Sequence, residues 1–173
     1  IWIGSSNGLQ RYDGVRFKNF RPIKKDSSTI PVRNVQQLLL DHKKNLWIHM
    51  PGDNVGIFDT RNFRYIPIPL RISNPNFRGG PKKIINDEQG NILVVIAQAE
   101  MLTYNERLKE FSPAHNFIRL PEGWRPVDLV QVPGTKKYII GCNNGLLVYN
   151  HQSGQSSYSG HNVEKEPLID ALG

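Results

Sequence analysis

The sequence lacks most of the features on which covalent stability or catalysis depends. Cys142 is the one cysteine among 173 residues, so an internal disulfide and a cysteine-based zinc site are both excluded. The five histidines show no metal-ligand spacing, and there is no Gly-rich phosphate loop and no Gly-x-Ser-x-Gly motif. No pair of carboxylates suggests acid–base catalysis. We therefore expect that this segment is not an enzyme and that it uses no cofactor and no metal.

Long hydrophobic runs are also missing. No apolar stretch approaches the ~18 residues that a membrane span needs, and none keeps a helical apolar pattern over ~11 residues. The net charge of +7 comes from 22 basic and 15 acidic residues, and the basic residues are scattered through turns. We expect no nucleic-acid partner, a modest attraction for anions, and contact with a membrane only through other parts of a longer chain.

What the sequence does contain is a repeat of about 46 residues. One landmark, at the second position of a short apolar run, recurs at intervals of 45, 46 and 46 residues: Trp2, Trp47, Leu93 and Ile139. A second landmark recurs at intervals of 46, 46 and 45 residues: Tyr12, Phe58, Tyr104 and Tyr149. A fixed period in the range of ~20–50 residues indicates a repeat architecture.

Each repeat contains four short apolar runs separated by Gly, Asn, Asp and Pro, which is typical of an antiparallel meander of strands. Several runs, such as residues 92–97, do not alternate between apolar and polar side chains, as expected for strands covered on both faces. Four strands in about 46 residues, stacked between neighbours, describe a blade of a β-propeller. A β-solenoid is the alternative, but its repeats are usually shorter.

The predicted fold class is therefore all-β, with about four blades of four antiparallel strands. We expect the last three strands of one blade in residues 1–20, blades at residues 33–66, 82–111 and 126–158, and the first strand of a further blade at residues 167–172. We interpret the chain as a fragment of a larger propeller of about seven blades. In the alternative, residues 167–172 pair with residues 1–20 and close a four-bladed ring.

Two kinds of repeated residue have structural explanations. Trp2 and Trp47 offer large apolar surfaces for the interface between blades. Gly8, Gly56 and Gly145 stand where the third strand of a blade begins, where glycine supplies backbone angles that other residues avoid.

The repeat resembles the two-component regulator propeller family. The residues that carry the resemblance are Trp2-Ile3-Gly4, Asn7-Gly8-Leu9 and Tyr12-Asp13, with partial copies at Asn45-Leu46-Trp47-Ile48, Phe58-Asp59 and Asn144-Gly145-Leu146. The third repeat departs from the pattern, with Leu93 in place of tryptophan.

The resemblance implies a periplasmic sensing domain of a bacterial inner-membrane receptor of the hybrid two-component type, common in Bacteroides-like organisms. Members of the family typically bind oligosaccharides and signal to a histidine kinase elsewhere in the chain. The implied partners are an oligosaccharide, the remaining blades of the parent chain and a second copy of the full ectodomain in a homodimer.

Candidate binding residues lie in the connections between blades, which are long: residues 21–32, 67–81 and 112–126. Long loops on a rigid scaffold are usually functional, and these share one rim with the loops between the second and third strands of each blade. Arginine binds carboxylate or sulfate, and tryptophan offers a flat face to a sugar. The candidate ligand-binding residues are Trp124, Arg125, Arg33, Arg78, His49 and Asn143.

Bland explanations and rival functions stand beside this hypothesis. Trp124 also fits a packing role between blades. A protein-interaction scaffold would expose an apolar patch on the same rim. The residues that could form such a patch are Ile68, Leu70, Ile72, Phe77, Phe117, Ile118 and Leu120. A polysaccharide-acting propeller enzyme would need clustered carboxylates, which this segment lacks.

Overall fold

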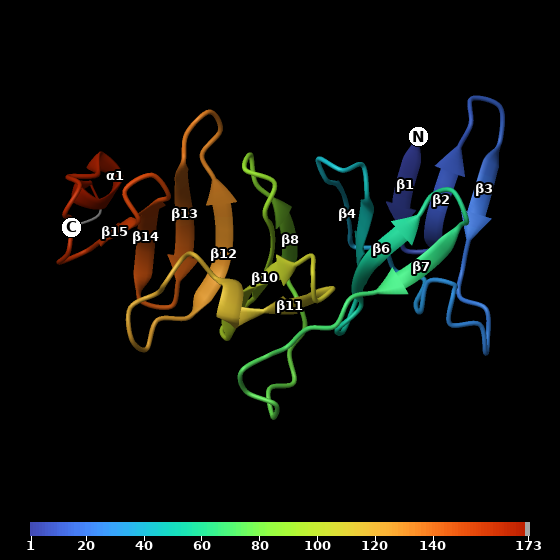
Figure 1. The fold of residues 1–173 in the computed structure, drawn as a ribbon, viewed down its shortest axis with the longest axis horizontal. Coiled ribbons are helices and arrows are strands. Elements are labelled where there is room, and N and C mark those ends of the chain that lie inside the picture. Colours follow the sequence, from blue (N-terminus) through green and yellow to red (C-terminus); the bar gives the residue numbers. More distant parts are fainter. Residues whose placement is uncertain (172–173) are drawn as a thin grey trace.

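Four antiparallel β-sheets lie side by side in an open row in the computed structural model, which describes residues 1–171 (Figure 1). Each sheet is a meander in which consecutive strands pair. The first sheet has three strands and the other three have four. The predicted fold class, all-β with propeller blades, is confirmed.

We number the sheets as blades 1 to 4 along the chain. Blades 1 and 2 contain β1 (Trp2–Ser5), β2 (Gly8–Tyr12) and β3 (Phe17–Phe20), then β4 (Gln37–Leu40), β5 (Leu46–His49), β6 (Val55–Asp59) and β7 (Arg64–Pro67). Blades 3 and 4 contain β8 (Lys83–Asn86), β9 (Ile92–Ile96), β10 (Glu100–Asn105) and β11 (Glu110–Ser112), then β12 (Pro126–Gln131), β13 (Lys137–Cys142), β14 (Gly145–Asn150) and β15 (Gln155–Tyr158).

The first strands of neighbouring blades are joined by polar side chains. The Gln37 amide brackets the backbone of Ile84, donating to its carbonyl at 2.7 Å and accepting from its N–H at 2.9 Å. In the next blade Lys83, which takes the place of Gln37 in the strand register, donates to Asp128 Oδ1 and to the Leu129 carbonyl, both at 3.1 Å. These bonds fix how the inner strands β4, β8 and β12 follow one another.

Between the blades, apolar side chains from facing sheets form the core. Trp47 is fully buried in β5, and its ring packs against Tyr104 and Phe111 of blade 3, at centroid distances of 4.8 and 5.7 Å. Its indole N–H donates to Asp41 Oδ2 at 2.9 Å. Trp2 makes the corresponding contact with Phe58 across the interface of blades 1 and 2. Both tryptophans therefore lie where the sequence places them.

The third repeat has no tryptophan at this position, and a residue of the next blade donates the corresponding hydrogen bond. Asp87 occupies the place of Asp41 and is 1% exposed, but the tryptophan position holds Leu93. The hydroxyl of Tyr138, in β13 of blade 4, donates to Asp87 Oδ2 at 2.6 Å. Burial, together with this hydrogen bond, raises the pKa of Tyr138 well above its usual range. A buried carboxylate thus binds blade 3 to blade 4.

The repeated glycines at the start of the third strands are required for two different physical reasons. Gly8 and Gly145 are each the first residue of a strand, and both have a positive φ, of 123° and 127°. Gly56 is the second residue of β6, has no positive φ, and is glycine for lack of space. A Cβ there would lie 2.4 Å from the Ile66 carbonyl oxygen and 2.6 Å from the ring of Tyr65. The prediction of special backbone angles was therefore wrong for Gly56.

The predicted strand at residues 167–172 is also wrong. Pro167–Asp170 forms a short α-helix, α1, and buries Ile169, while residue 172 of the predicted strand lies outside the described residues. Pro167 has no N–H to give to a strand ladder and its fixed φ suits the first turn of a helix. No neighbouring hairpin within residues 1–171 offers this segment a partner strand.

The four-bladed ring is not formed. Blade 1 and α1 lie at opposite ends of the row, with the N-terminus at one end and the last described residues at the other (Figure 1). Among the described residues, the sheet of blade 1 consists of β1, β2 and β3 alone. The open row agrees with the interpretation of a propeller fragment.

The Asp87–Tyr138 bond makes a prediction about stability. Tyr138→Phe removes one donor from a buried carboxylate that keeps its bonds from the turn, so we expect a loss of about 1–3 kcal/mol. Tyr149→Phe is the matched control, because the Tyr149 hydroxyl makes no hydrogen bond within residues 1–171, and we expect a change within about 0.5 kcal/mol. Urea unfolding measures both, and equal losses for the two variants would contradict this account.

The crowding at Gly56 makes a second prediction. Gly56→Ala forces the Cβ against backbone and an aromatic ring, and we expect a loss of about 1–3 kcal/mol in the free energy of unfolding. Gly141→Ala is the control, since the nearest atom to its Cβ would be Leu146 Cδ2 at 4.0 Å and its φ is not positive. If Gly56→Ala were as stable as Gly141→Ala in urea unfolding, β6 and β7 would be able to move and accommodate the Cβ without any loss in the free energy of unfolding.

Candidate functional site

The three long connections between blades lie on one rim of the row, the lower edge in Figure 1. They comprise residues 21–36, 68–82 and 113–125, whereas the turns on the opposite rim are short. Residues 113–125 include a 3₁₀ helix at Pro113–His115, capped by the Ser112 side chain. We call this edge the long-loop rim.

The first two long loops are fastened to the outer strand of the following blade. The Ser28 carbonyl accepts from Tyr65 N–H at 2.7 Å. Pro69 C=O accepts from Phe111 N–H at 2.9 Å, and Arg71 N–H donates to Phe111 C=O at 2.8 Å. The loop from β7 therefore adds a short strip, paired in parallel at Leu70 and Phe111, to the edge of blade 3.

The seven apolar residues expected to form an exposed patch on this rim turn inward or pack half-buried in the part of the chain that the structure describes. Ile68 and Ile118 are 4% and 3% exposed. The others pack, half-buried, against the cores between blades: Leu70, Ile72, Phe77, Phe117 and Leu120. Most of the apolar surface that an interaction scaffold would need from these seven residues is thus used in the cores between blades.

Trp124 and Arg125 lie together at the end of the third loop. Trp124 is half-buried, with its ring centroid 5.1 Å from that of Tyr158, whereas Arg125 is exposed. Asn143, in the loop between β13 and β14, holds this segment in place. Its Oδ1 accepts from Arg125 N–H at 2.7 Å, its Nδ2 donates to Gly123 C=O at 3.3 Å, and its own N–H donates to Arg125 C=O at 3.0 Å. Asn143 therefore positions the Arg125 loop.

Arg33 and Arg78 occupy comparable places on the first and second loops. Both are exposed, and Arg78 donates to the Pro75 carbonyl at 3.1 Å. Within residues 1–171 neither these two nor Arg125 forms an ion pair. Each long loop thus carries at least one exposed guanidinium that forms no ion pair within residues 1–171.

His49 lies beneath the long-loop rim rather than on it. The imidazole is 2% exposed at the end of β5, and neither ring nitrogen has a hydrogen-bond partner among the described residues, 1–171. Burial lowers the pKa of His49, and the nearby backbone of Pro81 opposes this only in part without reaching hydrogen-bonding geometry. His49 is therefore a neutral buried group in this structure.

Other chemistry is sparse in the part of the chain that the structure describes. Residues 1–171 contain no group of three or more His, Cys, Asp or Glu side chains placed to hold a metal. No helix there has the length and apolar character to cross a bilayer. Burial raises the pKa of the Cys142 thiol to about 11, so it is protonated and unreactive near neutral pH.

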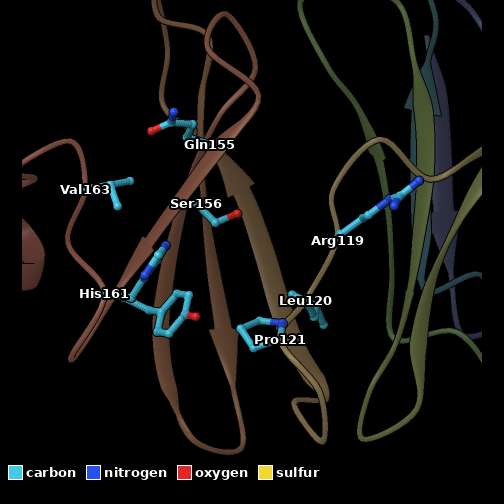
Figure 2. Close-up of a pocket in the computed structure, with 8 residues that line it drawn as sticks. Arg119, Leu120, Pro121, Gln155, Ser156, His161 and Val163 are labelled. Carbon is cyan, nitrogen blue, oxygen red and sulfur yellow. The ribbon is translucent and has the colours of Figure 1, made fainter.

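One concave feature was not predicted from the sequence. A groove of about 460 Å³ lies between the third long loop and β15, and we call it the β15 groove (Figure 2). The residues that line it are Arg119, Leu120, Pro121, Gln155, Ser156, Tyr158, His161 and Val163. The available signal was Ser156, which stands where the repeat has aromatic residues in the other blades.

The buried state of His49 predicts a pH dependence. As pH falls below about 6.5, the unfolded chain binds a proton that the folded chain excludes, so stability falls with a slope of up to ~1.4 kcal/mol per pH unit until the lowered folded pKa is reached. We expect His49→Leu to reduce the loss between pH 7.5 and 5.5 in urea unfolding, and His42→Leu, at an exposed position, to leave it unchanged. An identical pH profile for the wild type and His49→Leu would exclude this role.

The chain matches no protein-family model and no curated protein, whereas solved structures share its fold. One is the extracellular domain of the putative hybrid two-component system BT3049 from B. thetaiotaomicron, with 15% identity and a TM-score of 0.65, covering 90% of this chain and 22% of that one. Another is the extracellular domain of the putative one-component system BT4673 from the same organism, with 14% identity and a TM-score of 0.65, covering 94% of this chain and 21% of that one.

The chain therefore spans about a fifth of the length of either structure. At these identities the likeness concerns the fold. The chain has the blade architecture found in these bacterial extracellular domains.

Proposed function

We propose that the chain is part of the ligand-sensing, periplasmic domain of an inner-membrane two-component receptor, and that the full receptor signals to a histidine kinase. The observation that carries the proposal is the fold shared, over 90% and 94% of this chain, with extracellular domains of putative two-component and one-component systems. The repeat motifs around Trp2 and Trp47, which resemble those of the two-component regulator propellers, support it independently.

The ligand that the long-loop rim favours is an oligosaccharide with acidic groups, uronic or sulfated. Arg33, Arg78 and Arg125 each present an exposed guanidinium that has no ion-pair partner among residues 1–171, and a guanidinium binds carboxylate or sulfate through two parallel hydrogen bonds. Trp124, half-buried beside Arg125, offers the accessible part of its ring to a sugar. The net charge of +7 adds a weak general attraction for anions.

Signalling requires that ligand binding changes an equilibrium. A ligand shifts only those conformational equilibria whose states it binds differently. Because the first two loops are fastened by backbone hydrogen bonds to the next blade, the rim is a rigid surface within each blade pair. We propose that the oligosaccharide acts by favouring one arrangement of the ectodomain homodimer over another, without chemical change to the ligand.

A thermal-shift screen of the complete ectodomain tests the proposal. The panel contains neutral, uronic and sulfated oligosaccharides, and we expect stabilisation by one acidic class. A ligand at 100 times its Kd stabilises the folded state by about 2.7 kcal/mol. Arg125→Ala and Arg33→Ala should each reduce the shift. Arg107→Ala is the matched control, since Arg107 is also exposed but lies in the turn between β10 and β11 on the opposite rim.

The thermal-shift screen tests the proposed function and the proposed position of the binding site separately. A shift that persists in all three rim variants, Arg33→Ala, Arg78→Ala and Arg125→Ala, would remove the site from this rim. A well-folded ectodomain that responds to no glycan would contradict oligosaccharide sensing.

A further inference from the structure

Blade 4 differs from the other blades at one position of its outer strand. In each blade this position lies directly opposite the aromatic landmark of the third strand, and its residue is aromatic in blades 1 to 3 and small in blade 4: Phe17, Tyr65, Phe111 and Ser156. Tyr65 is 5% exposed and Phe111 is fully buried. The outer strand of blade 4 therefore supplies no ring at Ser156, and the ring that packs against the facing landmark, Tyr149, is that of Phe117 from the third long loop, at a centroid distance of 6.0 Å.

The same position also lacks its backbone partner. In blades 2 and 3 a strip from the preceding long loop covers the outer edge, at Tyr65 N–H in one and at Phe111 N–H and C=O in the other. In blade 4, the N–H and C=O of Tyr158 bond to His161, on the side away from β14. Because strand residues two apart present their backbone groups to the same side, those of Ser156 also point away from β14. Within residues 1–171 they have no hydrogen-bond partner.

The loop that could cover this edge is held elsewhere. Ile118 is buried in the core between blades 3 and 4, and the Phe117 ring packs 4.9 Å from His151 and 5.6 Å from Tyr138. A turn from Pro121 to Trp124 then leads the chain into β12. The β15 groove separates this loop from Ser156, and Figure 2 shows Pro121 on the side of this loop nearer the strand.

We propose that the β15 groove binds an extended segment of a partner protein, which pairs in parallel with β15 at Ser156 and places a large apolar side chain, best aromatic, in the space beside it. The chain itself supplies the template, because residues 69–71 pair in this way with Phe111. Strand addition of this kind takes its affinity from backbone hydrogen bonds and its specificity from side-chain pockets. The volume of about 460 Å³ lies within the ~300–1,000 Å³ typical of ligand pockets.

The first test uses a peptide copied from the template. A fluorescein-labelled peptide of residues 67–74, with Leu70→Phe, is titrated against the complete ectodomain and followed by fluorescence anisotropy. We expect saturable binding. The control peptide carries an N-methyl group on Arg71, which removes the N–H equivalent to the donor that bonds Phe111 C=O, and should bind at least about tenfold more weakly, or ~1.4 kcal/mol.

Two variants locate the binding. Ser156→Phe fills the space with the ring that blade 3 carries and should abolish binding, whereas Ser156→Ala, which keeps the space and the backbone, should bind as the wild type does. Hydrogen exchange of the peptide segment around Ser156 should slow on binding in the wild type. Since neither measurement involves a glycan, failure here leaves the proposed sensing of oligosaccharide untouched, and the reverse also holds.

Other results would overturn the proposal. Equal binding of the N-methylated peptide would exclude strand pairing, and binding that survives Ser156→Phe would exclude this groove. A concentration-dependent dimer that Ser156→Phe abolishes, with no binding of the peptide, would make a second copy of the chain the occupant. Slow hydrogen exchange at Ser156 in the free protein would show that the edge is already covered.

Discussion

The structure depends on the covering of each sheet by its neighbour. Strands such as β9, buried at all five residues, have no face for water, so no blade can bury its own apolar surface alone. Each interface therefore needs large side chains that reach into the neighbouring blade. It also needs a polar anchor, meaning a hydrogen bond to a buried carboxylate that fixes the position of such a side chain. At blades 2 and 3, Trp47 supplies both, since its ring enters the next blade while its N–H is held by Asp41.

The interface between blades 3 and 4 shows that the constraint is the anchor rather than the tryptophan. Asp87 keeps the turn that Asp41 makes, with Asn91 donating to it as Asn45 does to Asp41. The buried carboxylate still needs a further donor, because an unsatisfied buried charge is costly. With Leu93 unable to donate, the donor comes from Tyr138 across the interface. The repeat thus tolerates change in sequence as long as this bond is made from one side or the other.

The sequence was sufficient for features that follow from period and pattern. The 46-residue period predicted the positions of the strands and of the interface tryptophans. The long segments between repeats predicted that one rim carries long loops. It was insufficient where a contact depends on the third dimension. The sequence predicts His49 as a loop residue, but its ring is buried. The sequence also predicts a surface patch from the apolar residues of the long loops, but those residues pack into the cores between blades. Residues 167–170 have the apolar character of a first strand, yet without a neighbouring hairpin their Pro167 favours a helix.

The same distinction explains why the β15 groove is informative. An outer strand presents unpaired backbone groups, and proteins normally cover or disrupt such edges because they attract other chains. Blades 2 and 3 of this chain obey that rule by means of their loops. At β15 the hairpin to His161 protects Tyr158 but stops short of Ser156, and the side chain that would fill the adjoining space has been reduced to a hydroxymethyl group. Loss of the cover alone would leave an edge, and loss of the ring alone would leave a cavity. Their coincidence at one residue creates a slot with both a backbone register and a side-chain pocket, which are the two elements that recognition of an extended peptide requires.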